Sequence, residues 1–150
     1  MKRIVLSLLF SSAFLANAQF GALGAAKGQQ CVSNLKQIGV GLMMFDSDHG
    51  KRPAKLEDAA NYGLSGVLAC PVTKKKYLYL GPSGSRTMPV VMDALGNHPN
   101  EIHVLFGDGH VESIRHSSTH YKGLAGCFKG LSPREKKNLA EILRKLDSGK

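Results

Sequence analysis

Residues that bind metals or transfer protons gather between positions 98 and 110 of the chain. They are His98, His103, Asp108 and His110. Imidazole nitrogens and one carboxylate oxygen form an adequate ligand set for Zn²⁺ or a similar ion. The cluster therefore indicates a candidate zinc site, and with it a small metal-dependent hydrolase that uses His98, His103 and His110.

The same residues also have a structural interpretation. Asp108 and Gly109 are the residue pair that suits a type I′ β-turn. His98 is then expected to hydrogen-bond to this turn, and the spacing does not bring His103 and His110 face to face. We therefore expect a protein without catalytic residues and without a resident cofactor, and keep the zinc site as the alternative.

The three cysteines of the chain are Cys31, Cys70 and Cys127. In an oxidising compartment the simplest arrangement is one disulfide and one free thiol. A Cys31–Cys70 pair is favoured among the three pairings, because it would tie the first helix to the segment after its return loop. A free Cys127 would be a candidate nucleophile beside His116 and His120, although such a thiol more often forms an intermolecular disulfide or stays buried.

The N-terminus has the pattern of a secretory signal peptide. Lys2 and Arg3 precede a short apolar run that ends in the small residues ANA. We expect residues 1–18 to be a signal cleaved before Gln19, because the apolar run is shorter than the roughly 20 residues that span a bilayer. The mature chain would then be periplasmic or extracellular and would have no transmembrane segment.

The chain is basic, with a formal net charge of +9 that falls to +7 when Lys2 and Arg3 are removed. The positive side chains occur in short runs at 74–76, 134–137 and 144–145, with little aromatic residue between them. This pattern is typical of solvated surface. Its alternative is a surface that binds an anionic polymer, either a polysaccharide or a nucleic acid.

An amphipathic helix is the element that must position these groups, and its clearest part is 31–46. Its apolar residues recur at spacings of four, three, four and three, which puts them on one stripe: Cys31, Leu35, Ile38, Leu42 and Phe45. Gly39 and Gly41 interrupt the helix, and each costs about 1 kcal/mol relative to Ala. That cost indicates close approach by another element.

Strands are expected at 77–80 and 88–93 and, as a hairpin, at 102–106 and 110–114. With Asp108-Gly109 as a two-residue loop, Phe106 lies opposite Val111 and Val104 opposite Ser113. The apolar face formed by these pairs is expected to pack on the helix stripe.

Further helices are expected at 55–66 and at the C-terminus. Ser132, Pro133 and Glu135 combine an N-cap, a proline at the first helical position and a capping-box acid, so a helix is predicted from Pro133 to Asp147. The segment 116–130 reads as a loop with two apolar anchors, Leu124 and Phe128.

Two motifs resemble a known family. The run CVSNLKQIG at 31–39 resembles the N-terminal helix of pseudopilin-like secreted proteins, and His98 is followed after nine residues by Asp108-Gly109. That second motif is similar to the prepilin-type H-X9-DG domain, and Cys70-Pro71 lies between the two in the order that the family shows. The resemblance covers about residues 27–115 and relates the chain to the pseudopilins of type II secretion.

The resemblance implies an α+β fold in which a long N-terminal helix packs on a small antiparallel sheet, and the capping residues add a C-terminal helix that lies outside the resemblance. It implies a domain at 31–115 between a flexible leader at 19–30 and a C-terminal segment at 116–150. In function it implies a non-enzymatic extracytoplasmic protein that acts by contact with other envelope or secreted proteins. The sheet edge and the terminal helix are the expected contact surface.

Two consequences of the resemblance concern the ligand and the leader. Pseudopilin relatives can carry calcium near the sheet, and Asp93, Asp108 and Asn97 or Asn100 offer oxygen ligands, although no DxDxDG run is present. The family begins with a basic leader, a Gly-Phe-Thr-Leu-Ile-Glu-like site and an uninterrupted apolar anchor. This chain has a signal of the general secretory type in their place.

Overall fold

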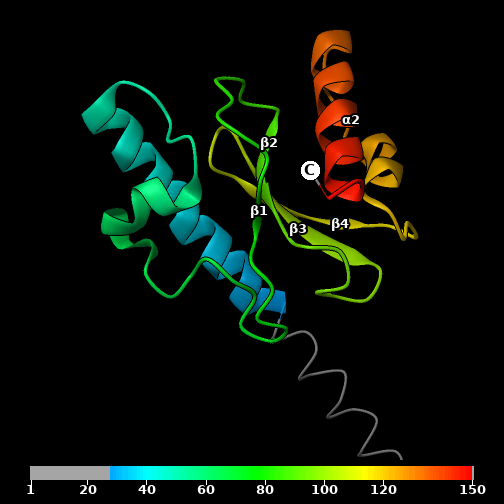
Figure 1. Ribbon diagram of the computed structural model, residues 1–150, viewed down its shortest axis with the longest axis horizontal. Helices are drawn as coiled ribbons and strands as arrows, with labels where there is room; N and C mark the ends of the chain where they lie inside the picture. The colour runs from blue at the N-terminus through cyan, green and yellow to red at the C-terminus, as the bar shows by residue number, and fades with distance from the viewer. Residues whose placement is uncertain (1–27, 150) are drawn as a thin grey trace, which may run out of the picture.

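The computed structural model describes residues 28–149 and has an α+β fold in three layers (Figure 1). A four-stranded antiparallel sheet lies in the middle, with the N-terminal helix on one face and the C-terminal helix α2 on the other. The expected signal at 1–18 and the leader up to residue 27 lie outside the described residues. A helix covers 28–49, so residues 28–30 of the expected leader are helical.

The sheet is a meander in which each strand pairs with the next along the chain. Its strands are β1 Leu78–Tyr79, β2 Pro89–Met92, β3 Glu101–Phe106 and β4 Val111–Arg115. A register shift lies between Pro89 and Val91, at the start of β2. A proline is tolerated there because the ladder is interrupted and one donor fewer is needed.

The β3–β4 hairpin differs by one residue from the predicted register. Leu105, not Phe106, pairs with Val111, and Val104 pairs with Glu112. The loop contains Gly107 as well as Asp108 and Gly109, with the Gly109 N–H bonded to the Phe106 carbonyl at 2.9 Å. Gly109 has φ of +91°, which is the left-handed residue of a three-residue hairpin loop.

Gly107 joins the loop because another segment leaves no room for a side chain there. A Cβ at this position would lie 1.9 Å from the carbonyl oxygen of Ser85. The Gly107 N–H donates to the carbonyl of Met88 at 2.9 Å, and its own carbonyl accepts from the Arg52 guanidinium at 2.6 Å. Contacts from distant parts of the chain therefore decide the loop length.

The changed register also changes which helix covers which strand residues. The even-numbered residues of β3, Ile102, Val104 and Phe106, share a core with Leu139 and Leu143 of α2. The N-terminal helix instead packs its stripe against Leu105 of β3 and Val91 of β2. The prediction that the Val104 and Phe106 face packs on the N-terminal helix is therefore wrong.

The remaining elements connect these layers. The expected helix at 55–66 is two short turns, a 3-10 helix η1 at Leu56–Ala59 and a π-helix η2 at Ala60–Leu64. Gly63, at φ of +78°, ends regular helix geometry there. A further 3-10 helix, η3 at Tyr121–Cys127, lies in the expected loop and buries Leu124, and α2 spans Pro133–Asp147 as predicted.

Candidate functional site

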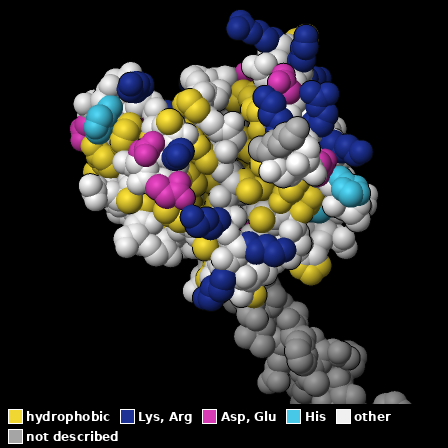
Figure 2. Space-filling view, viewed as in Figure 1, with side chains coloured by type: hydrophobic (Ala, Val, Ile, Leu, Met, Phe, Trp, Pro, Cys, Tyr) yellow, Lys and Arg dark blue, Asp and Glu magenta, His cyan; other side chains and the backbone are white. Residues whose placement is uncertain are grey.

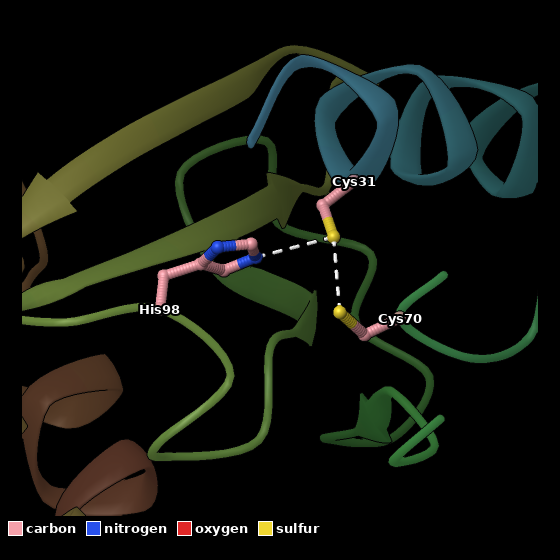
Figure 3. Close-up of side chains that lie close together, drawn as sticks. All are labelled: Cys31, Cys70 and His98. Carbon is pink, nitrogen blue, oxygen red and sulfur yellow. Dashed lines mark hydrogen bonds between the residues drawn. The ribbon is translucent and has the colours of Figure 1, made fainter. Parts of the chain in front are cut away.

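Three side chains from separate parts of the fold meet at one end of the N-terminal helix (Figure 3). The Sγ atoms of Cys31 and Cys70 lie 3.5 Å apart, and Nε2 of His98 lies 3.2 Å from Sγ of Cys31. All three of these atoms lie within 4.8 Å of one another. Both cysteines are fully buried, and the His98 side chain is 10% exposed.

Each of these residues is held by its own element. Cys31 is the first residue of the buried helix stripe. Cys70 begins a turn in which its N–H donates to the carbonyl of Lys75 and its carbonyl accepts from the N–H of Lys74, both at 2.9 Å. His98 lies in the loop between β2 and β3 and forms an isolated bridge with Glu101.

The buried carboxylate of Asp93 lies beside the same nitrogen of His98 that faces Cys31. Oδ2 of Asp93 lies 3.6 Å from His98 Nε2 and accepts hydrogen bonds from the backbone N–H and from Nδ1 of His103, at 3.0 and 2.6 Å. Its other oxygen, Oδ1, accepts from Nδ2 of Asn97 at 3.3 Å, and Asn97 in turn accepts from the Thr73 hydroxyl at 2.6 Å. A fully buried carboxylate requires such partners, because isolated burial of a charge is costly.

Burial and hydrogen bonding set the protonation of the cluster. Burial raises the pKa of Cys31 to about 12, so its thiol is protonated at neutral pH in the absence of a bound cation. Burial also acts to raise the pKa of Cys70, but hydrogen bonds from Thr73 and Val72 outweigh it and the net pKa is lowered. Burial lowers the pKa of His98 against the opposing charge of Asp93, which favours the neutral imidazole.

The arrangement does not match a Cys-His-acid relay. In such a relay the thiol and the acid bond to different nitrogens of the imidazole. Here the sulfur of Cys31 and the carboxylate of Asp93 both approach Nε2 of His98. The geometry is that of a cluster of ligand atoms, in which a protonated and fully buried Cys31 is a poor nucleophile.

The histidines and the aspartate predicted as one zinc site fall into two separate places. His98 and His103 lie together, with ring centroids 4.7 Å apart. Asp108 and His110 bond to each other at the hairpin loop, with Oδ1 and Nδ1 2.5 Å apart. His103 is itself a residue of β3, and residues 104–106 of that strand, about 10 Å at about 3.3 Å per residue, lie between it and the hairpin loop and keep the two pairs apart.

This separation also corrects the expected structural role of His98. His98 bonds to Cys31 rather than to the Asp108-Gly109 turn, which lies beyond the far end of β3. The calcium ligands are divided in the same way, since Asp93 bonds to Asn97 while Asp108 lies at the hairpin. Both oxygens of Asp93 already accept N–H donors, so Asp93 is not part of an oxygen cage.

The sequence indicated part of the observed cluster. Cys31 and Cys70 were expected to be neighbours, and they are, although their sulfurs are 3.5 Å apart and a disulfide bond is about 2.05 Å long. The disulfide stays a prediction. The place of His98 beside them and the central role of Asp93 carried no local signal, because both depend on how the β2–β3 loop folds back to the helix.

A surface pocket of about 360 Å³ opens next to the cluster. Its lining includes Gly28 and Gln29 of the helix together with His98, Glu101 and His103. Of the three clustered residues only His98 lines this pocket, and Cys31 and Cys70 lie fully buried away from it.

Comparison of the chain with models of protein families, with curated proteins and with solved structures found no match. Among residues 28–149, no helix combines the length and the apolar character needed to cross a membrane. The function is therefore inferred from the geometry of this chain.

Proposed function

We propose that this protein is an exported pilin-like protein that acts by binding other proteins of the cell envelope or other secreted proteins, without catalysis of its own. The observation that carries this proposal is the outward side of the N-terminal helix. Val40, Met43 and Met44 are 52%, 48% and 52% exposed, on the side opposite the buried stripe. Large apolar side chains grouped on a surface are a common mark of a protein contact.

The helix thus carries apolar residues on two sides. The stripe that begins at Cys31 packs against the sheet. The spacing of Val40, Met43 and Met44 puts these three residues together on another face of the helix. Methionine side chains adapt to different partners because they are flexible and polarisable. This outward face fits a partner helix or groove with an apolar stripe of its own, and it is a different surface from the sheet edge and terminal helix expected from the sequence.

Site-specific photo-crosslinking tests the proposal. A photoreactive amino acid is placed at Val40 in the full chain, expressed in the cell that exports it, with the exposed Ala140 of α2 as the matched control position. We expect an adduct of discrete mass from position 40, absent from position 140 and lost when Met44→Glu is added. Equal adducts from both positions, or adducts at position 40 that survive Met44→Glu, would contradict the proposal.

A second candidate function is binding of an anionic polymer, and one specific observation favours it. Figure 2 shows Lys and Arg side chains gathered over α2. Among the described residues, the salt bridges of this helix are limited to the pair of Lys145 with Glu141 at 3.0 Å, which engages one of the five Lys and Arg side chains of α2. The dependence of binding on salt separates the two candidates, because screening weakens charge contacts and spares apolar ones.

A further inference from the structure

We propose that Cys31, Cys70 and His98 form a binding site for a thiophilic d¹⁰ cation, Zn²⁺ or Cu⁺, with both Sγ atoms and Nε2 as direct ligands. Two thiolates and one imidazole are the donor set that such ions prefer over Mg²⁺ and Ca²⁺. This site shares only His98 with the histidine cluster expected from the sequence. It is independent of the proposed binding of partner proteins.

The distances between the donor atoms support this assignment. Bonds of about 2.3 Å to sulfur and about 2.05 Å to nitrogen in a tetrahedral site separate two sulfurs by about 3.8 Å and a sulfur from a nitrogen by about 3.6 Å. The observed separations are 3.5 Å between the sulfurs and 3.2 Å between Cys31 Sγ and His98 Nε2. These two separations are therefore within a few tenths of an ångström of the tetrahedral values, and the third pair, Cys70 Sγ and His98 Nε2, lies within 4.8 Å.

The third ligand distinguishes a metal site from a simple thiol pair. A disulfide needs only Cys31 and Cys70, whereas His98 reaches the same point from a loop far along the chain and turns Nε2 to Cys31 (Figure 3). The loop is held in place by the Asn97 side chain, which bonds to Asp93 and to Thr73. The three donors are thus positioned before an ion arrives, which lowers the ordering cost of binding.

The surroundings suit a cation. Asp93 places a buried carboxylate 3.6 Å from the ligand nitrogen of His98, and no arginine or lysine side chain bonds to the cluster among the described residues. His103 and Asn97 hold this carboxylate in place, as outer-shell partners do in metal sites. Both oxygens of Asp93 are already hydrogen-bonded, so a water entering from the neighbouring pocket, which His98 lines, would complete the coordination.

Metal binding and disulfide formation are alternative states of the same cysteine pair. Binding of Zn²⁺ releases two thiol protons and transfers no electrons. Disulfide formation instead transfers two electrons and two protons to an oxidant such as another disulfide, which becomes two thiols. The site therefore requires the reduced pair, and the test is made under reducing, oxygen-free conditions.

The experiment is a titration of the full chain, reduced and freed of metal with a chelator, first with Co²⁺ as an optical probe and then with Zn²⁺. We expect one Co²⁺ per chain with a thiolate-to-cobalt charge-transfer band, and displacement of that Co²⁺ by Zn²⁺. His98→Gln should weaken binding by more than the 10–100-fold that is typical of outer-shell changes, and Asp93→Asn by about 10–100-fold. Cys127→Ser and His110→Gln are matched controls outside the cluster and should bind as the unchanged chain does.

A measurement on the unchanged chain covers the case in which a variant fails to fold. Bound Zn²⁺ should slow the alkylation of Cys31 and Cys70 beyond the slowing that their burial already causes, and should leave the half-buried Cys127 as reactive as before, which peptide mass spectrometry reads at each cysteine. Absence of the charge-transfer band, unchanged affinity in His98→Gln, or equal protection of all three cysteines would each overturn the proposal.

Discussion

A single glycine shows how the N-terminal helix reaches the rest of the fold. A Cβ on Gly41 would lie 2.5 Å from Cδ2 of Leu64 and 2.9 Å from the carbonyl oxygen of Tyr62. Gly39 is less constrained, because its nearest neighbour is the flexible end of Leu105 at 3.0 Å. The expectation that these glycines mark close approach by another element is confirmed.

Gly41→Ala tests this contact, because helix propensity alone predicts that the substitution stabilises the protein whereas the close contact predicts that it destabilises it. Alanine in an exposed helix position stabilises by about 1 kcal/mol relative to glycine. At Gly41 we expect a net loss of about 1–3 kcal/mol in the free energy of unfolding, because one of the atoms that the new methyl group meets is the backbone carbonyl oxygen of Tyr62, which cannot rotate away as a side chain can. Urea denaturation followed by circular dichroism measures this value.

Gly39→Ala is the matched comparison in the same helix. Its cost should be smaller than that of Gly41→Ala, since the Leu105 side chain can rotate. A stabilised Gly41→Ala variant would show that η2 does not lie against the helix as described.

At the scale of elements, features set by neighbouring residues could be predicted from the sequence, and features set by contacts between distant segments could not. The terminal helix was predicted to the residue, because Ser132, Pro133 and Glu135 act within one turn and the structure shows their capping box. The β3–β4 register was missed by one residue because Gly107 is fixed by Ser85, a contact that no local pattern contains. The same holds for the candidate site: the proximity of Cys31 and Cys70 was predicted, but the position of His98 beside them was not.

The capping box gives α2 a defined dependence on pH. Hydrogen bonds from Ser132 and then from Ser85 lower the pKa of Glu135 from its usual value of 4.5 to about 2. Because the folded pKa is depressed, the stabilisation by this carboxylate is fully present above pH 4.5 and is lost as the pH falls towards 2. Glu135→Gln keeps the capping geometry without the charge, so its free energy of unfolding should fall less than that of the unchanged chain between pH 4.5 and 2.

Urea denaturation at a series of pH values in this window measures the difference. Ser132→Ala is the companion variant, and loss of the N-cap should cost about 1 kcal/mol at pH 7. Parallel pH profiles for the unchanged chain and Glu135→Gln would show that the contacts of Glu135 do not persist in solution.

At the scale of the whole molecule, one sheet serves two cores that face opposite ways. Alternate residues of β3 point to the N-terminal helix and to α2, so Leu105 belongs to one core and Val104 to the other. The sequence predicted both helices and all four strands, but not which face each helix covers, because a register change of one residue exchanges the two faces. The fold thus sets the apolar face of the N-terminal helix and the basic face of α2 on opposite sides of the sheet.

Because the two faces lie on opposite sides of the sheet, the basic face of α2 can be changed without altering the apolar face of the N-terminal helix. Lys136 and Lys137 are exposed on α2, and Lys36 and Lys51 are exposed on the side of the N-terminal helix. With double-stranded DNA as a model anionic polymer, Lys136→Glu with Lys137→Glu should weaken binding and reduce the slope of log affinity against log salt by about 2. Lys36→Glu with Lys51→Glu makes the same change in net charge on the other side, so it should leave most of that slope in place. Equal losses from the two double variants would mean that net charge alone attracts the polymer and that α2 is no specific binding surface.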